Sequence, residues 1–313
     1  MLHGWIILDK PLGLGSTTAV SAVKRLLREA GEPKTKVGHG GTLDPLATGV
    51  LPIALGEATK LAGRMLDATK EYDFTIRFGQ ETNTLDAEGE LAASSAVRAT
   101  VEQVEAVLPR FIGQIEQVPP AFSALKIGGK AAYERVRAGE TLEMKSRTVT
   151  VHTLRVSASP REQRNDLTRR RGDAEEVEQV TLSAEVSKGT YIRSLARDIA
   201  HALGTVGHVT YLRRTRAGPF SLSQAISLDF LEEAAKARQL TRTVLPLTAA
   251  LDDIPALPVT PDQARLLRHG QRLSGFPAKP GLSLATSDDV PVALVEASAD
   301  GLKVVRGFNL LDE

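Results

Sequence analysis

Apolar residues recur in short stretches along this chain, and their spacing predicts more strands than helices. Residues 72–78 alternate between aromatic or aliphatic and polar side chains, which is typical of a strand with one buried face. Residues 148–156 and 177–186 have the pattern of two hairpin strands, and residues 206–215 that of another strand. Shorter strands are expected at 5–8, 50–55 and 121–127, with Pro52 indicating an edge or a bulge.

The sequence also predicts helices, over residues 17–30, 57–66, 101–108, 131–138, 192–203 and 261–269. Ser16 is the expected N-cap of the first helix. Strands and helices do not alternate regularly. This pattern favours an α+β fold with a mixed, mostly antiparallel central sheet flanked by helices, rather than a doubly wound fold.

The composition of the sequence changes near Leu251, where a linker-like segment rich in proline and aspartate begins. We therefore expect one domain over residues 1–250 and a small β-rich domain over 255–313, with one helix and three short strands. Residues 160–178 are almost free of apolar side chains, so we expect a mobile insertion between two strands.

Composition narrows the possible chemistry. The absence of cysteine excludes disulfides, thiolate zinc sites and cysteine nucleophiles, and the six histidines show no metal-ligand spacing. No signal peptide and no apolar membrane span can be identified, which leads us to expect a cytoplasmic protein that does not bind membranes. The net charge of +1 gives no indication of a nucleic-acid partner. If the protein binds phosphate groups, local clusters of arginine would have to do so.

The segment from His39 to Val50 is the strongest candidate for chemistry. It places Asp44 between Leu43 and Pro45, and glycines on both sides allow a ligand to approach the backbone closely. The competing interpretation is structural, because Asp followed by Pro commonly begins a helix. Gly49 follows within a turn, which argues against a long helix.

Two further segments carry side chains suited to a nucleotide site. Tyr72 begins a strand, where it is either an ordinary core residue or a ring that stacks on a base. Arg193 lies at the start of a helix, where a cation gains nothing from the helix dipole. Its position suggests a carboxylate or phosphate partner, although a structural salt bridge is the more common outcome.

These segments resemble the sequence motifs of the TruB family of tRNA pseudouridine synthases. The resemblance runs in order from about residue 3 to 230, and the C-terminal region from about Leu257 resembles a PUA domain. Gly40 departs from the family, which commonly has Thr there, and the 160–178 insertion has no family counterpart. The motifs that carry the resemblance are Asp9–Gly13 with Ser16, Gly38–Gly49, Leu55–Lys60, Lys70–Tyr72, Val118–Lys126 with Gly129–Tyr133, Lys188–Arg193 and Val209–Arg214.

The resemblance implies the pseudouridine synthase fold and isomerisation of uridine to pseudouridine at position 55, in the T-arm loop of tRNA, by base flipping. It implies that Asp44 is the catalytic aspartate, that Arg193 pairs with it, and that Tyr72 stacks on the base and moves a proton. Whether Asp44 attacks ribose C1′ or uracil C6, or acts through a glycal, stays open. Further substrate contacts are expected from His39, Lys60, Tyr191 and Leu212, and phosphate contacts from Lys126, Lys130, Arg213 and Arg214.

No cofactor, no metal and no obligate protein partner are expected, and the chain is expected to act as a monomer on the T-arm stem-loop of tRNA. Two alternatives remain at this stage. One is a relative that depends on a guide RNA inside a ribonucleoprotein. The other is an RNA chaperone or binding protein without turnover.

Overall fold

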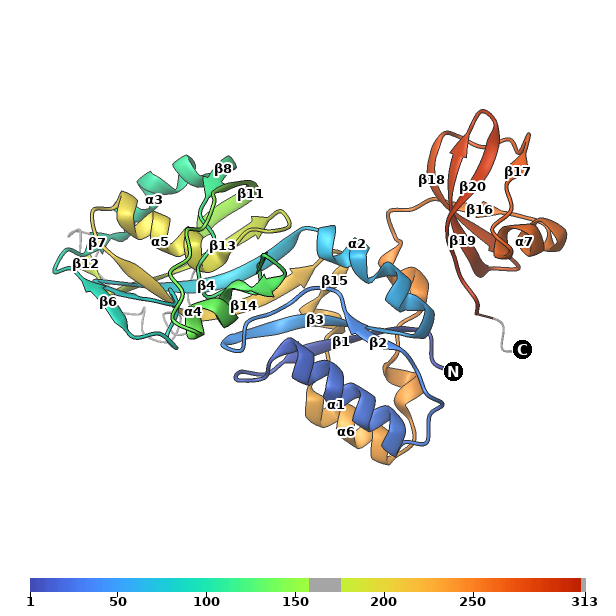
Figure 1. Cartoon of the computed structure of the whole chain (residues 1–313), viewed down its shortest axis with the longest axis horizontal. Helices are drawn as coiled ribbons and strands as arrows, with labels where there is room; N and C mark the ends of the chain where they lie inside the picture. The colour runs from blue at the N-terminus through green and yellow to red at the C-terminus, as the bar shows by residue number, and fades with distance from the viewer. Residues whose placement is uncertain (158–175, 311–313) are drawn as a thin grey trace, which may run out of the picture. The chain divides into compact units, whose positions relative to one another are not determined.

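A computed structural model describes residues 1–157 and 176–310, which form two compact units. The first unit contains the described residues of Met1–Leu43, Val50–Leu66 and Gly218–Glu313, and the second those of Asp44–Gly49 and Asp67–Ala217. Figure 1 follows the chain through its elements. The predicted insertion over 160–178 lies almost wholly outside the described residues.

The second unit is built on a mixed sheet in which antiparallel pairs predominate, as predicted. Strand β14 pairs in parallel with the first residues of β3 and antiparallel with β4, and the order continues through β13, β11 and β8. The predicted hairpin is confirmed by the pairing of β11 with β13. The strands are β3 (Ala47–Leu55), β4 (Lys70–Phe78), β8 (Gly113–Gln117), β11 (Arg147–Val156), β13 (Gln179–Val186) and β14 (Gly207–Ala217).

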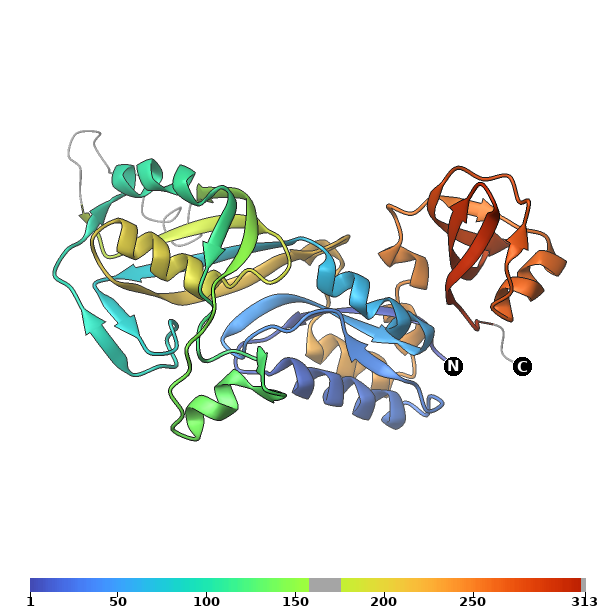
Figure 2. The same ribbon diagram turned by 45° about the horizontal axis from the view of Figure 1, so that its top comes forward.

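Helices and small two-stranded sheets complete the second unit. Helix α5 packs against β14 and β4 and lies beside α3 (Figure 2). The strand predicted over 121–127 is wrong except at its end, where only Lys126–Ile127 pair as a strand, and residues 121–124 form bends instead. The elements are α3 (Val101–Val107), α4 (Ala132–Arg137), α5 (Ile192–Ala202), β5 (Gln80–Thr82), β6 (Leu91–Ser94), β7 (Ala99–Thr100), β9 (Lys126–Ile127), β10 (Lys130–Ala131) and β12 (Glu176–Val177).

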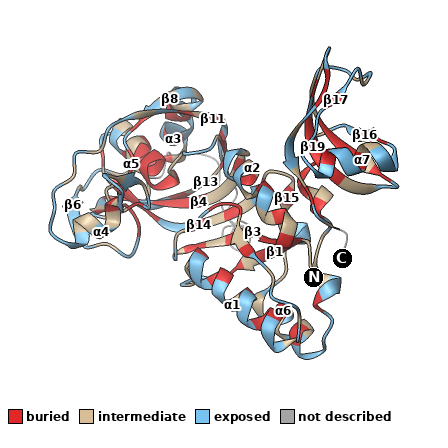
Figure 3. Cartoon of the chain, turned by 45° about the vertical axis from the view of Figure 1, so that its right-hand side comes forward, coloured by how far each residue is buried: buried red, intermediate tan, exposed pale blue. Residues whose placement is uncertain are grey.

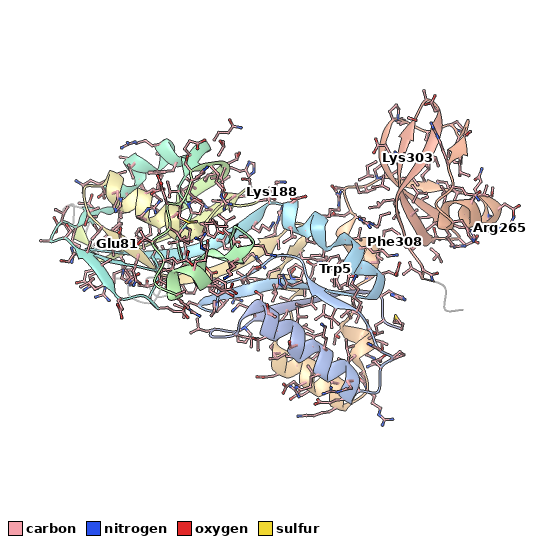
Figure 4. All side chains as sticks on the ribbon, in the orientation of Figure 1. Trp5, Glu81, Lys188, Arg265, Lys303 and Phe308 are labelled. Atoms are coloured by element: carbon pink, nitrogen blue, oxygen red, sulfur yellow. The ribbon has the colours of Figure 1, made fainter. Side chains whose placement is uncertain are left out.

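The N-terminal part of the first unit packs helices and strands around a core of buried apolar residues. Strand β3 has β1 (Gly4–Lys10) on one side and β2 (Val37–His39) as another partner, so it is not an edge strand, and the edge alternative of the edge or bulge predicted from Pro52 is wrong. Trp5, labelled in Figure 4, is fully buried. Its ring centroid lies 5.4 Å from that of Phe220. Helices α1 (Ser16–Glu29) and α6 (Leu228–Lys236) lie side by side, and α2 spans Ala62–Asp67.

Ser16 does not cap α1 as predicted. The N-cap is Gly15, and Ser16 is the first residue of the helix. Its hydroxyl instead donates to the carbonyl of Leu43 at 2.9 Å and accepts from the N–H of Leu43 at 2.8 Å. Ser16 thus fixes the backbone of the residue directly before Asp44.

The C-terminal part of the first unit is β-rich, as predicted, but it has more strands than the three expected. Five strands form a sheet in the order β16–β18–β19–β20–β17, and their buried residues pack against α7 (Figure 3). Phe308 is buried after the last strand. The elements are β16 (Ala256–Pro258), α7 (Pro261–Arg268), β17 (Leu273–Ser274), β18 (Gly281–Ser287), β19 (Val290–Ser298) and β20 (Gly301–Gly307).

Over the described ranges 1–157 and 176–310, none of the helices is both long enough and apolar enough to cross a membrane.

Gly40 is explained by close packing within the first unit. A Cβ atom built on Gly40 would lie 2.6 Å from Cβ of Met65, which is nearer than real Cβ contacts. Met65 is itself buried, so it has little room to move away. The glycine at this position is therefore coupled to the methionine that faces it.

We predict that Gly40→Thr lowers the free energy of unfolding by about 1–3 kcal/mol, the usual effect of overpacking a core. In a Met65→Gly background the same change should lower it by clearly less, because the Cβ atom of residue 65 that makes the clash is gone. Urea unfolding of the four proteins of this cycle measures the difference. Equal reductions in both backgrounds would contradict the packing explanation.

Candidate active site

Arg193 lies at the centre of the second unit's main polar cluster. Its side chain is only 6% exposed, and its guanidinium contacts two carboxylates at once. Nη2 is 2.8 Å from Oδ2 of Asp44, and Nη1 is 3.3 Å from Oδ2 of Asp86. Nη1 also donates to the carbonyl of Thr84 at 2.8 Å, and Nη2 to that of Phe122 at 3.0 Å. The buried charge is thus both paired and hydrogen-bonded, as burial requires.

The start of α5 is anchored so that Arg193 can reach this cluster. The buried side chain of Gln117 accepts a hydrogen bond from the N–H of Tyr191 at 2.8 Å and donates to its carbonyl at 3.2 Å. Ser194 donates to the carbonyl of Val118 at 2.8 Å. Leu195 and Ile199 are fully buried on the apolar face of the helix. Helix packing and two polar anchors therefore set the direction of the arginine.

Asp86 was not predicted from the sequence. It belongs to a tight turn, where Oδ1 accepts from the Thr84 hydroxyl at 2.6 Å and from the N–H of Glu88 at 3.1 Å. These bonds leave Oδ2 for Arg193. The only sequence signal is a polar, turn-forming run over residues 81–89, which does not distinguish a structural aspartate from one that faces a site.

Asp44 differs from Asp86 in its access to solvent. Its side chain is 38% exposed, whereas that of Asp86 is 9% exposed. No helix begins at Asp44, because its carbonyl accepts from the N–H of Ala47 and the chain passes through a turn into β3. The N-cap alternative is therefore wrong. Asp44 is the carboxylate of the pair that a ligand can reach.

A small pocket opens beside this ion pair. Asp44, Asp86 and Arg193 form its polar part, and Leu46, Ala47 and Val209–Leu212 form the rest. Its volume of about 10 Å³ is enough for roughly one water molecule. A ligand as large as a nucleobase would therefore have to enter from the exposed side of Asp44 and move side chains at the mouth.

Strands β3, β14 and β4 bring other predicted residues toward the pocket. Leu212, which lines it, pairs with Ala47 on one side and with Phe74 on the other. Tyr72 lies two residues from Phe74, so both side chains project from the same face of β4. The sheet therefore places Tyr72 on the face that carries Leu212, although Tyr72 does not line the pocket itself.

Gly49 allows β3 to approach β14 closely. Its φ is +100°, and a Cβ atom there would lie 2.2 Å from the carbonyl oxygen of Arg214. Arg214 is only 1% exposed, so its guanidinium cannot reach a phosphate backbone, and its predicted role as a surface phosphate contact needs correction. Arg213 is partly exposed, with Nη1 3.3 Å from the hydroxyl of Thr48.

The remaining predicted residues of the second unit lie outside the pocket. Lys126 and Lys130 are exposed on the β9–β10 hairpin. The ring of Tyr191 packs under the guanidinium of Arg147, whose Cζ lies 4.8 Å from the ring centroid.

Two predicted residues belong to the first unit. Nδ1 of His39 accepts from the N–H of Gly41 at 3.3 Å. Lys60 pairs with Glu57 at 2.6 Å and donates to the carbonyl of Gly307 at 2.9 Å. Both side chains thus have local partners in the structure.

Lys70 is a buried cation. It belongs to the Lys70–Tyr72 motif, but the sequence predicted no role for it. It lies at the start of β4, and Nζ donates to the carbonyl of Ala68 at 2.7 Å. Burial, reinforced by the nearby charge of Arg214, lowers the pKa of Lys70 to about 8. Among the residues described, no cluster of three or more His, Cys, Asp or Glu side chains could hold a metal ion.

Comparison with known proteins accounts for this arrangement. Residues 24–192 match the TruB family pseudouridylate synthase N-terminal domain, and residues 193–252 match the tRNA pseudouridylate synthase B C-terminal domain. The chain belongs to the TruB family. It is therefore a pseudouridine synthase, an isomerase, as the sequence motifs predicted.

Full-length relatives support the family assignment. The tRNA pseudouridine synthase B of Zymomonas mobilis is 58% identical over 98% of this chain and 96% of its own length. That of Novosphingobium aromaticivorans is 58% identical over 100% of this chain and 99% of its own length. These TruB relatives match the C-terminal β-rich part of the chain as well as the part that contains Asp44.

Solved structures support the fold. The archaeal box H/ACA sRNP Nop10–Cbf5 complex contains a chain that is 25% identical, with a TM-score of 0.68 over 97% of this chain and 85% of that one. An H/ACA RNP bound to a substrate RNA containing 2′-deoxyuridine gives 24% identity and a TM-score of 0.69, over 98% of this chain and 85% of that one. The predicted fold class is confirmed.

The lowered pKa of Lys70 predicts a pH dependence of stability. Between pH 8 and 10.5 the unfolded chain holds more protons at this lysine than the folded chain, so the penalty for burying the charge falls as pH rises. The stability of the wild type relative to Lys70→Met should rise through this window, by at most about 1.4 kcal/mol per pH unit. Urea unfolding of both proteins from pH 7 upward measures it, and a constant difference would contradict the assignment.

Proposed function

We propose that this TruB synthase converts one uridine in the T-arm loop of tRNA, at position 55, to pseudouridine, and that Asp44 is the residue that acts on the nucleotide. The observation that carries the proposal is the asymmetry of the two carboxylates on Arg193. Asp86 is buried and held by its own turn, whereas Asp44 is open to solvent at the pocket mouth. A substrate would therefore meet Asp44 first.

The reaction needs no external reactant. The N1–C1′ glycosidic bond breaks, a C5–C1′ bond forms, C5 loses a proton and N1 gains one. The uridine must leave its stack to be reached, which costs a few kcal/mol. An aspartate can serve as a nucleophile in such a reaction, whether at ribose C1′ or uracil C6, or can remove a ribose proton on the way to a glycal.

The surrounding residues suggest the other roles. Arg193 holds the Asp44 carboxylate through Nη2, which would orient the opposite oxygen toward the substrate. Leu212 would pack against the uracil ring from β14. Tyr72, on the same face of the sheet, would stack on the base and accept the C5 proton, directly or through water. The exposed cations Lys126 and Lys130 and the partly exposed Arg213 would contact phosphates.

The named relatives favour this substrate over the alternatives. The curated full-length relatives are tRNA pseudouridine synthases, whereas the guide-RNA-dependent particles share only about a quarter of the sequence with this chain. A binding protein without turnover would have no need for an exposed carboxylate on a buried arginine. The β-rich C-terminal part would act as a PUA-like RNA-binding module, and the chain would work as a cytoplasmic monomer.

The purified protein should form pseudouridine in an unmodified tRNA transcript with no added RNA or protein. Asp44→Asn should lower the single-turnover rate at least about a thousandfold, because it removes the reacting group, while RNA affinity stays close to wild type. Asp252→Asn is a matched control, since Asp252 is exposed and lies outside the pocket. Turnover by Asp44→Asn at a rate near that of the control would refute the role of Asp44, and no wild-type product would refute the substrate.

A further inference from the structure

A groove in the first unit is lined by the last turns of α1, by the connection from α1 to β2, and by the start of β2. Figure 1 shows these elements of the chain. Its volume is about 930 Å³. Leu27 and Val37 are buried and supply an apolar base. Four exposed cations line it as well: Lys24, Arg28, Lys34 and Lys36.

Some other cations of the same unit have carboxylate partners. Arg25, for example, is 3.1 Å from Glu29 and 3.0 Å from Glu232, and Arg64 pairs with Asp253. Within the described part of the chain, no carboxylate forms an ion pair with any of the four groove cations. The groove contains one carboxylate, Glu32, so its charged lining residues sum to +3 (four cations minus one anion).

The groove is held in shape by backbone contacts. Gly31 ends α1 with a φ of +82°, and the N–H of Glu32 donates to the carbonyl of Leu27 at 3.0 Å. At the other end of the connection, the carbonyl of Lys36 accepts from the N–H of Gly56 at 2.8 Å. A ligand that binds here does not have to order the connecting segment, which lowers the entropic cost of binding.

The chemistry of the lining selects a polyanion whose charges are spread along its length. The groove offers several separate ammonium and guanidinium groups and has no aromatic side chain among its lining residues. Such a surface can bind phosphates but cannot stack bases, so it suits backbone contacts that do not depend on sequence.

The position of the groove in the sequence connects it with the Asp44 loop. Eight residues of chain lead from Lys36 to Asp44. Whatever the arrangement of the two units, such a segment spans at most about 29 Å. A structured RNA with a nucleotide at Asp44 therefore extends far enough to meet the groove.

We infer that this groove binds the phosphodiester backbone of a helical stem of the substrate tRNA, outside the nucleotide that enters the Asp44 pocket. The inference rests on the proposed function and adds a second contact surface to it. The main alternative is that these cations only stabilise the fold. Lys24 and Arg28 lie near the C-terminal end of α1, where a cation interacts favourably with the helix dipole. Lys34 and Lys36 lie outside the helix, and the dipole does not account for them.

The test compares two triple variants with equal changes of net charge. The groove variant carries Lys24→Gln, Lys34→Gln and Lys36→Gln. The control variant carries Lys236→Gln, Arg238→Gln and Arg242→Gln, three exposed cations of the same unit that do not line the groove. The measurement is the Kd for an unmodified tRNA transcript between about 0.05 and 0.2 M salt.

The groove variant should bind more weakly, and the slope of log Kd against log salt should fall by about 2–3, because each cation that is removed leaves roughly one phosphate unneutralised. The control should change the slope by less than about 1 on the same scale. A single-stranded oligonucleotide with the loop sequence should bind both variants equally, because it has no helical stem. Thermal unfolding of both variants shows whether the fold is retained.

Equal slopes in the two triple variants would overturn the inference, as would an equal decrease of affinity for the single strand. This failure is distinct from failure of the proposed function. If the wild type forms pseudouridine in tRNA while the groove variant binds tRNA like the control, the proposed function is supported and the assignment of the groove as an RNA-binding surface is refuted.

Discussion

The candidate site depends on one buried guanidinium held between two carboxylates. Arg193 is almost inaccessible to solvent, so its charge is tolerable only because Asp44, Asp86 and two carbonyls surround it. Each carboxylate contacts a separate nitrogen of the guanidinium, Asp44 at Nη2 and Asp86 at Nη1. Asp44 is the more exposed of the two carboxylates.

The rest of the second unit holds the three members of this cluster in place. Gln117 and Ser194 fix the start of α5, the Thr84 hydroxyl fixes Asp86, and Gly49 lets the strand after Asp44 approach β14. The residue before Asp44 is fixed by Ser16. Reactive side chains need this kind of support, because a misplacement of about 1 Å can cost a hundredfold in rate.

The sequence predicted most of the fold and part of the site, and the failures have physical reasons. Alternating apolar residues identified β4 and the β11–β13 hairpin, and the motifs identified Asp44, Arg193 and Leu212. Asp86 was missed because its role depends on a contact with α5, more than a hundred residues further along the chain. Arg214 was predicted to contact phosphate because the motif shows a cation at this position. The motif does not show that the side chain is buried.

The charge-conserving change Arg193→Lys tests the central claim most directly. A lysine keeps the positive charge but cannot donate to Asp44 and Asp86 together in the fork geometry of a guanidinium. We predict that the single-turnover rate of pseudouridine formation in saturating tRNA falls by about a hundredfold or more, with Kd close to wild type. A rate within a few-fold of wild type would contradict the claim that the shared guanidinium sets Asp44 for reaction.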